Sequence, residues 1–168
     1  GIRVHKVNVV WPLEATSTRG FAKGLQEILV IEEKRQVIEY QIKEELYNWR
    51  SDVRPNVLGK FDEAEGENGQ CGEWSMPNPS ENWLLRAKAD LTPAIIAKAI
   101  AKRLKKLGFA PAGSDIAARM DQRIAVIEAR EKSLAATPSG GAERAPWVCS
   151  GCPHNTSTRV PEGSRAVA

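Results

Sequence analysis

The sequence predicts an α/β fold built on a small parallel, or mostly parallel, sheet with flanking helices. Three observations lead to this class: a near-continuous apolar run at residues 27–31, an amphipathic helical pattern at 36–49, and a short apolar segment at 56–60. A strand, a helix and a strand in this order form a right-handed crossover, which leaves the two strands parallel. The 168 residues suffice for one modest domain with a core and an additional segment.

Two elements are expected before the apolar run at residues 27–31. Residues 2–10 alternate in polarity and are rich in valine, which predicts a first strand. Residues 16–26 predict a short helix, because two apolar side chains four residues apart share one face. The run at 27–31 then has the composition of a buried parallel strand.

The segment 36–49 switches to a helical period. Its apolar face is expected to comprise Ile38, Ile42, Leu46 and Trp49, and its outward face Glu39, Lys43 and Glu44. Residues 56–60 follow as a candidate third strand.

Two longer helices are predicted in the second half of the chain. Thr92 can cap the first, Pro93 suits its first turn, and Gly108 can close it. The second runs from about residue 114 to 136. The segment 62–90, which is rich in Gly, Asn, Glu and Pro, is expected to be a long loop with a functional or interface role.

A Thr-Pro-Ser-Gly-Gly linker at residues 137–141 suggests a domain boundary. We therefore expect an α/β domain at residues 1–110, a helical connector and linker at 111–141, and the truncated start of another domain at 142–168. Both ends are expected to continue into a longer polypeptide.

Composition and charge exclude several classes of protein. The chain is 42% hydrophobic and 27% charged, as is ordinary for a globular protein. A net charge of +3 gives no reason to expect nucleic acid or a membrane surface as a partner. No apolar run reaches the length of a membrane span, and no signal-peptide pattern is present. Three unevenly spaced cysteines do not form a disulfide framework, so we expect a reduced, cytoplasmic protein.

The run from Cys149 to His154 carries the strongest chemical signal. Because Cys149 and Cys152 are two residues apart, one turn can present both sulfurs to a metal or an iron–sulfur centre. Gly151 can adopt the positive dihedral that such turns need. Spacing alone also fits a zinc half-site, a redox-active pair or two inert thiols. His154 could be a zinc ligand, a cofactor contact or an ordinary loop histidine, and Cys71 is expected to be a free thiol.

Two charged segments could serve a site or simply face solvent. Residues 32–35 follow the buried strand, at the carboxyl edge where α/β sheets bind ligands, although a solvated turn explains them equally well. The helix before Gly108 ends with basic side chains that suit its dipole and require no partner, namely Lys102, Arg103, Lys105 and Lys106.

Longer segments resemble one known family. Residues 147–165, which contain Cys-Ser-Gly-Cys-Pro-His-Asn-Thr-Ser-Thr, resemble the opening of the thiamine-diphosphate-binding domain in the indolepyruvate ferredoxin oxidoreductase family, particularly its large fused bacterial members. Residues 28–35 and 42–49 resemble the preceding domain of that family, which is like the C-terminal domain of transketolase. The matches occur in the family's order and bracket most of the chain.

The resemblance implies an enzyme that oxidatively decarboxylates aryl 2-oxoacids such as indolepyruvate, using thiamine diphosphate with Mg as cofactor. It implies that coenzyme A takes the acyl group and that electrons pass through iron–sulfur clusters to ferredoxin. Cys149 and Cys152 would hold two irons of a 4Fe-4S cluster whose other ligands lie beyond Ala168. His154 would lie near the thiamine diphosphate or the substrate, and the parent enzyme would be a homodimer.

The family's Gly-Asp-Gly motif for the metal and diphosphate is not in this chain, and the glutamate that activates the cofactor belongs to an upstream domain. The chain is therefore expected to act mainly as a scaffold that adds two cluster ligands, and to be inactive in isolation. A zinc-binding interaction module and a thiol redox protein, each using Cys149 and Cys152, remain the alternatives.

Overall fold

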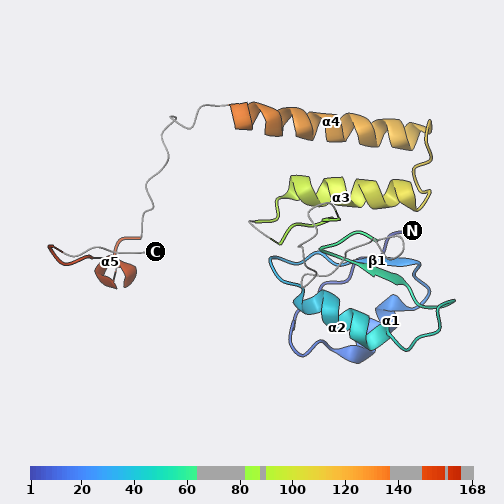
Figure 1. The fold of residues 1–168 in the computed structure, drawn as a ribbon, viewed down its shortest axis with the longest axis horizontal. Helices are drawn as coiled ribbons and strands as arrows, with labels where there is room; N and C mark the ends of the chain where they lie inside the picture. The colour runs from blue at the N-terminus through green and yellow to red at the C-terminus, as the bar shows by residue number, and fades with distance from the viewer. Residues whose placement is uncertain (64–81, 88–89, 137–148, 158, 164–168) are drawn as a thin grey trace. The chain divides into compact units, whose positions relative to one another are not determined.

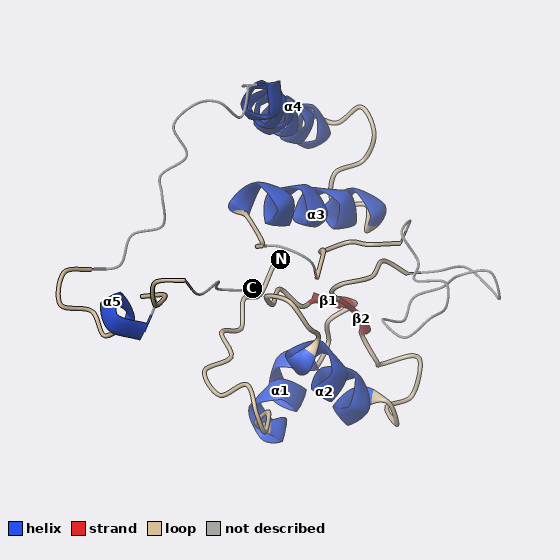
Figure 2. Cartoon of the chain, turned by 60° about the vertical axis from the view of Figure 1, so that its left-hand side comes forward, coloured by secondary structure: helices blue, strands red, loops and turns tan. Residues whose placement is uncertain are grey.

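The computed structural model describes residues 1–63, 82–87, 90–136, 149–157 and 159–163. The chain divides into two compact units, Gly1–Ile127 and Glu128–Ala168. Its elements, labelled in Figures 1 and 2, are α1 (Ala15–Ala22), β1 (Glu27–Leu29), α2 (Val37–Leu46), β2 (Asn56–Leu58), α3 (Pro93–Lys106), α4 (Asp115–Ala136) and α5 (His154–Ser157).

The sheet of the first unit consists of β1 and β2, which pair in parallel. Glu27 lies opposite Asn56 and Leu29 opposite Leu58, with α2 as the crossover between the strands. The Val30 amide extends the ladder by donating to the Leu58 carbonyl at 2.7 Å. The predicted α/β class with a small parallel sheet and flanking helices is therefore confirmed.

Each face of this short sheet is covered by helices (Figures 1 and 2). Successive strand side chains point to opposite faces, so the two strands can serve two cores. One core joins the sheet to α1 and α2 and contains Ala22, Ile28, Val30, Ile42, Leu46 and Val57. The other joins the sheet to α3 and contains Leu58, Leu84, Leu85 and Ala99, with Leu29, Ile95 and Ile96 packed against it.

The predicted helices are present with slightly different ends. The helix expected at 16–26 spans Ala15–Ala22, and the one expected at 36–49 spans Val37–Leu46. Thr92 caps α3 as expected, because its hydroxyl accepts from the Ile95 amide at 3.3 Å.

The strand predicted at residues 2–10 is wrong: none of these residues lies in a strand. Side chains hold the segment in place, since Arg3 donates to the Lys23 carbonyl at 2.9 Å and Gln41 donates to the Val10 carbonyl at 2.8 Å. Alternation predicts a strand only where a neighbour offers its backbone edge. Within the described part of the chain no backbone pairs with this segment, and Val4 is 90% exposed.

The remaining expectations concern the segments around residues 64–81 and 137–148. Most of the predicted 62–90 loop, with Cys71, lies outside the described residues, as does the linker at 137–141.

Residues 82–85 return beside the end of β2, where Phe61 and Trp83 form an antiparallel bridge with ring centroids 4.3 Å apart. None of the helices in the described ranges combines the length and apolar character needed to cross a membrane.

Candidate functional site

The cysteine loop of the second unit is a tight turn. The Cys152 amide donates to the Cys149 carbonyl at 2.9 Å, and Gly151 has a φ of 80°. Glycine reaches this left-handed conformation without the steric cost that a Cβ imposes. The sequence prediction of a positive dihedral at Gly151 is confirmed.

Asn155 braces the turn from the helix that follows. Its side-chain amide donates to the Cys149 carbonyl at 2.9 Å, and its backbone amide donates to the Cys152 carbonyl at 3.0 Å. Both cysteine carbonyls are therefore engaged within the loop. Sequence reasoning missed this role of Asn155, although a polar residue three positions after a Cys-x-x-Cys turn is a suitable brace.

The structure brings His154 to one of the two sulfurs. Its Nδ1 lies 3.1 Å from Cys152 Sγ, within hydrogen-bond distance for sulfur. Both cysteines are free thiols, with Cys149 exposed and Cys152 half-buried. Thiolates are the ligands that iron–sulfur clusters and zinc prefer, so the chemistry of this loop fits either centre.

The loop fits such a centre only in part. Among the described residues, no three or more His, Cys, Asp or Glu side chains are grouped so that they could hold a metal ion. Cys149 and Cys152 would therefore be two of the four ligands that a four-iron cluster needs. Further ligands would have to come from outside the described residues.

A group of ionisable side chains centred on Arg103 is buried beside the sheet. The guanidinium is 4% exposed and donates to both carboxylate oxygens of Glu27, at 2.9 and 2.5 Å, and to Asp62 at 2.7 Å. Hydrogen bonds with Glu27, followed by the charges of Glu27 and Asp62, outweigh burial and raise the pKa of Arg103. The expectation that Arg103 needs no partner is wrong, because it lies one turn after buried Ala99 on the face of α3 that meets the sheet.

Two lysines complete this buried network at its rim. Lys102 pairs with Asp62 at 2.5 Å, and Lys106 pairs with Glu63. Burial alone would raise the pKa of Asp62, but the bond and charge of Lys102 bring it below its ordinary value. The bond from Lys106 likewise lowers the pKa of Glu63. Three cations and three carboxylates of this network are therefore paired with one another, so its charges balance.

The carboxyl edge of the sheet carries a related arrangement. Glu39 is fully buried and accepts from the Lys60 amide at 3.0 Å and from Lys43 Nζ at 2.5 Å. The expectation that Glu39 points outward is wrong, because it shares the buried face of α2 with Ile42 and Leu46. Burial lowers the pKa of Lys60, while the charges of nearby glutamates oppose this shift.

Glu32 and Glu33 have structural partners at the same edge. The carboxylate of Glu32 accepts from the Val37, Ile38 and Glu39 amides at 2.8–3.0 Å, which caps α2. Glu33 accepts from the Leu91 amide at 3.1 Å. These contacts favour a structural role for the turn over the cofactor rim that the sequence left open.

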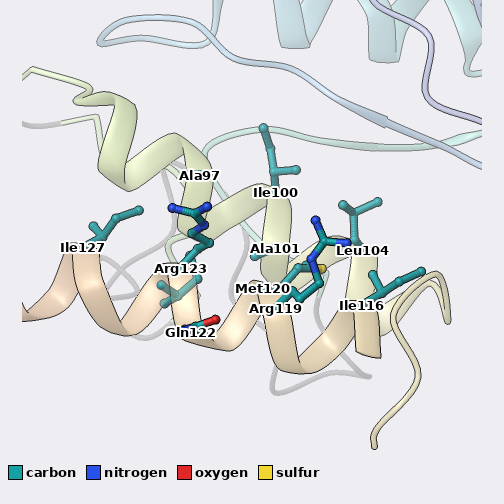
Figure 3. A pocket seen from close by; sticks show the side chains of 11 residues that line it. Ala97, Ile100, Ala101, Leu104, Ile116, Arg119, Met120, Gln122, Arg123 and Ile127 are labelled. Carbon is teal, nitrogen blue, oxygen red and sulfur yellow. The ribbon is translucent and has the colours of Figure 1, made fainter. Parts of the chain in front are cut away.

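An apolar groove of about 650 Å³ lies between α3 and residues 115–127 of α4 (Figure 3). Its polar lining residues are Arg119, Gln122 and Arg123. Apolar side chains form the rest: Ala97, Ile100, Ala101, Leu104, Ile116, Met120, Ile124 and Ile127. No lining residue is a nucleophile or a general acid or base suited to neutral pH, so the groove offers contact surface and no catalytic group.

Residues 1–137 match the family model described as the indolepyruvate ferredoxin oxidoreductase middle domain. Searches of curated proteins and of solved structures return no match. The match covers both helix-covered faces of the sheet and the Arg103 network, and it ends before the cysteine loop. The chain therefore belongs to the indolepyruvate ferredoxin oxidoreductase middle domain family.

Proposed function

We propose that this chain is the scaffold of a 2-oxoacid ferredoxin oxidoreductase, followed by a loop that supplies Cys149 and Cys152 to a 4Fe-4S cluster. The observation that carries the proposal is the order of the two features. A middle-domain match over residues 1–137 is followed, twelve positions later, by two free thiols on a braced turn. Family membership supports the oxidoreductase assignment, and the soft thiolate donors support the cluster.

The proposed reaction of the parent enzyme is the oxidative decarboxylation of an aryl 2-oxoacid such as indolepyruvate. The bond between the keto carbon and the carboxylate breaks to release carbon dioxide, and a thioester bond forms to coenzyme A. The thiol proton of coenzyme A is released, and two electrons leave singly to two oxidised ferredoxins. Thiamine diphosphate with Mg would supply the electron sink for this decarboxylation.

The part played by residues 1–110 is proposed to be scaffolding. The charged groups of the Arg103 network are paired with one another, as expected of structural ion pairs. The middle domain would position neighbouring domains of the parent polypeptide and contribute to a homodimer. The proposed setting is cytoplasmic, with no nucleic acid or membrane as partner, and the boundaries at residues 110 and 141 belong to the same proposal.

Metal analysis of the full-length parent enzyme, purified without oxygen, tests the assignment. We expect iron and acid-labile sulfide together, with loss of one cluster's share of both in Cys149→Ser and Cys152→Ser. Ser150→Ala, in the same turn, is the matched control and should keep full iron. Stoichiometric zinc in place of iron would support the interaction module, and a reversible disulfide without metal would support the thiol redox protein.

An activity assay of this chain alone tests the proposed scaffold role. The 168-residue chain, supplied with indolepyruvate, thiamine diphosphate, Mg, coenzyme A and a viologen dye, should show no dye reduction above background. Dye reduction that depends on coenzyme A would contradict the scaffold role.

A further inference from the structure

The contact between His154 and Cys152 is set by the local backbone. His154 is the first residue of α5 and stands two positions after Cys152. The Asn155 amide donates to the Cys152 carbonyl at 3.0 Å, which fixes the direction in which the chain leaves the turn. This path places the imidazole Nδ1 3.1 Å from Cys152 Sγ.

The direction of the hydrogen bond follows from the chemistry of a cluster ligand. A cysteine that binds iron does so as a thiolate, which has no proton and can only accept. A ring nitrogen at hydrogen-bond distance must then carry the proton. In the cluster-bound enzyme His154 would therefore donate from Nδ1–H.

We propose that His154 is a positioning and tuning residue that donates an N–H···S hydrogen bond to Cys152 and raises the reduction potential of the cluster. This inference rests on the proposed function, because it presupposes that Cys152 binds iron. A donor at sulfur withdraws electron density from the thiolate and stabilises the reduced cluster more than the oxidised one. The geometry places His154 against the sulfur.

The test uses the full-length parent enzyme and its midpoint potential, followed by electron paramagnetic resonance during a redox titration. His154→Ala removes the donor and should shift the potential of one cluster to a more negative value at unchanged iron content. His154→Asn is the conservative variant, because its side-chain amide can place an N–H near the position of Nδ1. We expect His154→Asn to keep the potential close to that of the wild type. Thr156→Ala, on the exposed side of the same short helix, should leave the potential unchanged.

Each outcome decides something specific. An unchanged reduction potential in His154→Ala with full iron would contradict the proposed hydrogen bond and leave the cluster assignment intact. Loss of the cluster in both His154→Ala and His154→Asn would overturn the tuning role, since it would make His154 a ligand. If His154→Ala alone loses the cluster, retention of iron and potential by His154→Asn supports the donor. Full iron in the cysteine variants would instead refute the proposed function.

Discussion

Arg103 and Glu27 are 76 positions apart in the sequence, yet they form a two-point ion pair in which Nε and Nη2 each donate to one carboxylate oxygen. The pair joins the third turn of α3 to the first residue of β1, and both side chains are at least 94% buried. Planar guanidinium and carboxylate groups match each other in this arrangement, so the pair fixes the position of the helix as well as neutralising the charges.

Replacing Arg103 should destabilise the domain strongly. Arg103→Met leaves the buried carboxylate of Glu27 without its partner and Asp62 with Lys102 alone, which costs about 3–5 kcal/mol of unfolding free energy. Lys105→Met is the matched control on the same helix, because the pair of Lys105 with Asp121 is exposed and worth about 0–1 kcal/mol. Urea denaturation of the two variants measures the difference. Equal losses would show that the buried network contributes no more than a surface pair.

A side chain at position 59 should destabilise the fold while Glu39 is present. A Cβ on Gly59 would lie 2.7 Å from the Cδ atom of the Glu39 carboxylate, so Gly59→Ala should cost about 1–3 kcal/mol through overpacking. In a Glu39→Ala background the same change should cost less, which a double-mutant cycle would record as a coupling energy. Gly20→Ala is the control, since its Cβ meets nothing within 4 Å. An identical cost in both backgrounds would contradict the close approach.

Glu14 should make the fold acid-sensitive. Its carboxylate caps α1, and hydrogen bonds from Ser17, then Thr16, lower its pKa from 4.5 to about 2. A lowered pKa means that the folded state binds fewer protons than the unfolded state. The stabilisation is therefore present above pH 4.5 and lost as the pH falls toward about 2.

Two measurements check this behaviour. Nuclear magnetic resonance titration of the Glu14 carboxyl carbon should give a midpoint near 2. Glu14→Gln should lose less stability than the wild type over the same acid interval, although Asp62 and Glu63 titrate in that direction in both proteins. Parallel stability curves for the two proteins would mean that the cap contributes nothing there.

The helices and the parallel pair of strands could be predicted because each depends on a local pattern. Apolar periodicity located α2, and the Thr92–Pro93 start located α3 within one or two residues. The strand predicted at residues 2–10 is wrong because a strand forms only where a second backbone pairs with it. Alternating polarity indicates which side chains could face solvent, but it does not show whether a second strand is available to pair with the segment.

The buried charges show a second limit of sequence reasoning. Glu39 and Arg103 are polar by composition, so a helical wheel assigns them to solvent, although each lies on a buried face of its helix. Their partners are distant in sequence: Lys60 is 21 positions after Glu39, and Glu27 is 76 positions before Arg103. In the cysteine loop, by contrast, the bonds that form the turn span at most six residues, and the spacing and Gly151 predicted it.

The central claim is that Cys149 and Cys152 bind a four-iron cluster, and its most direct test is electron paramagnetic resonance of the dithionite-reduced parent enzyme with and without both sulfurs. For the Cys149→Ser, Cys152→Ser double variant we predict the loss of one reduced-cluster signal, together with about four irons per chain. Signals and iron content identical to those of the wild type, at full oxidoreductase turnover, would contradict the claim.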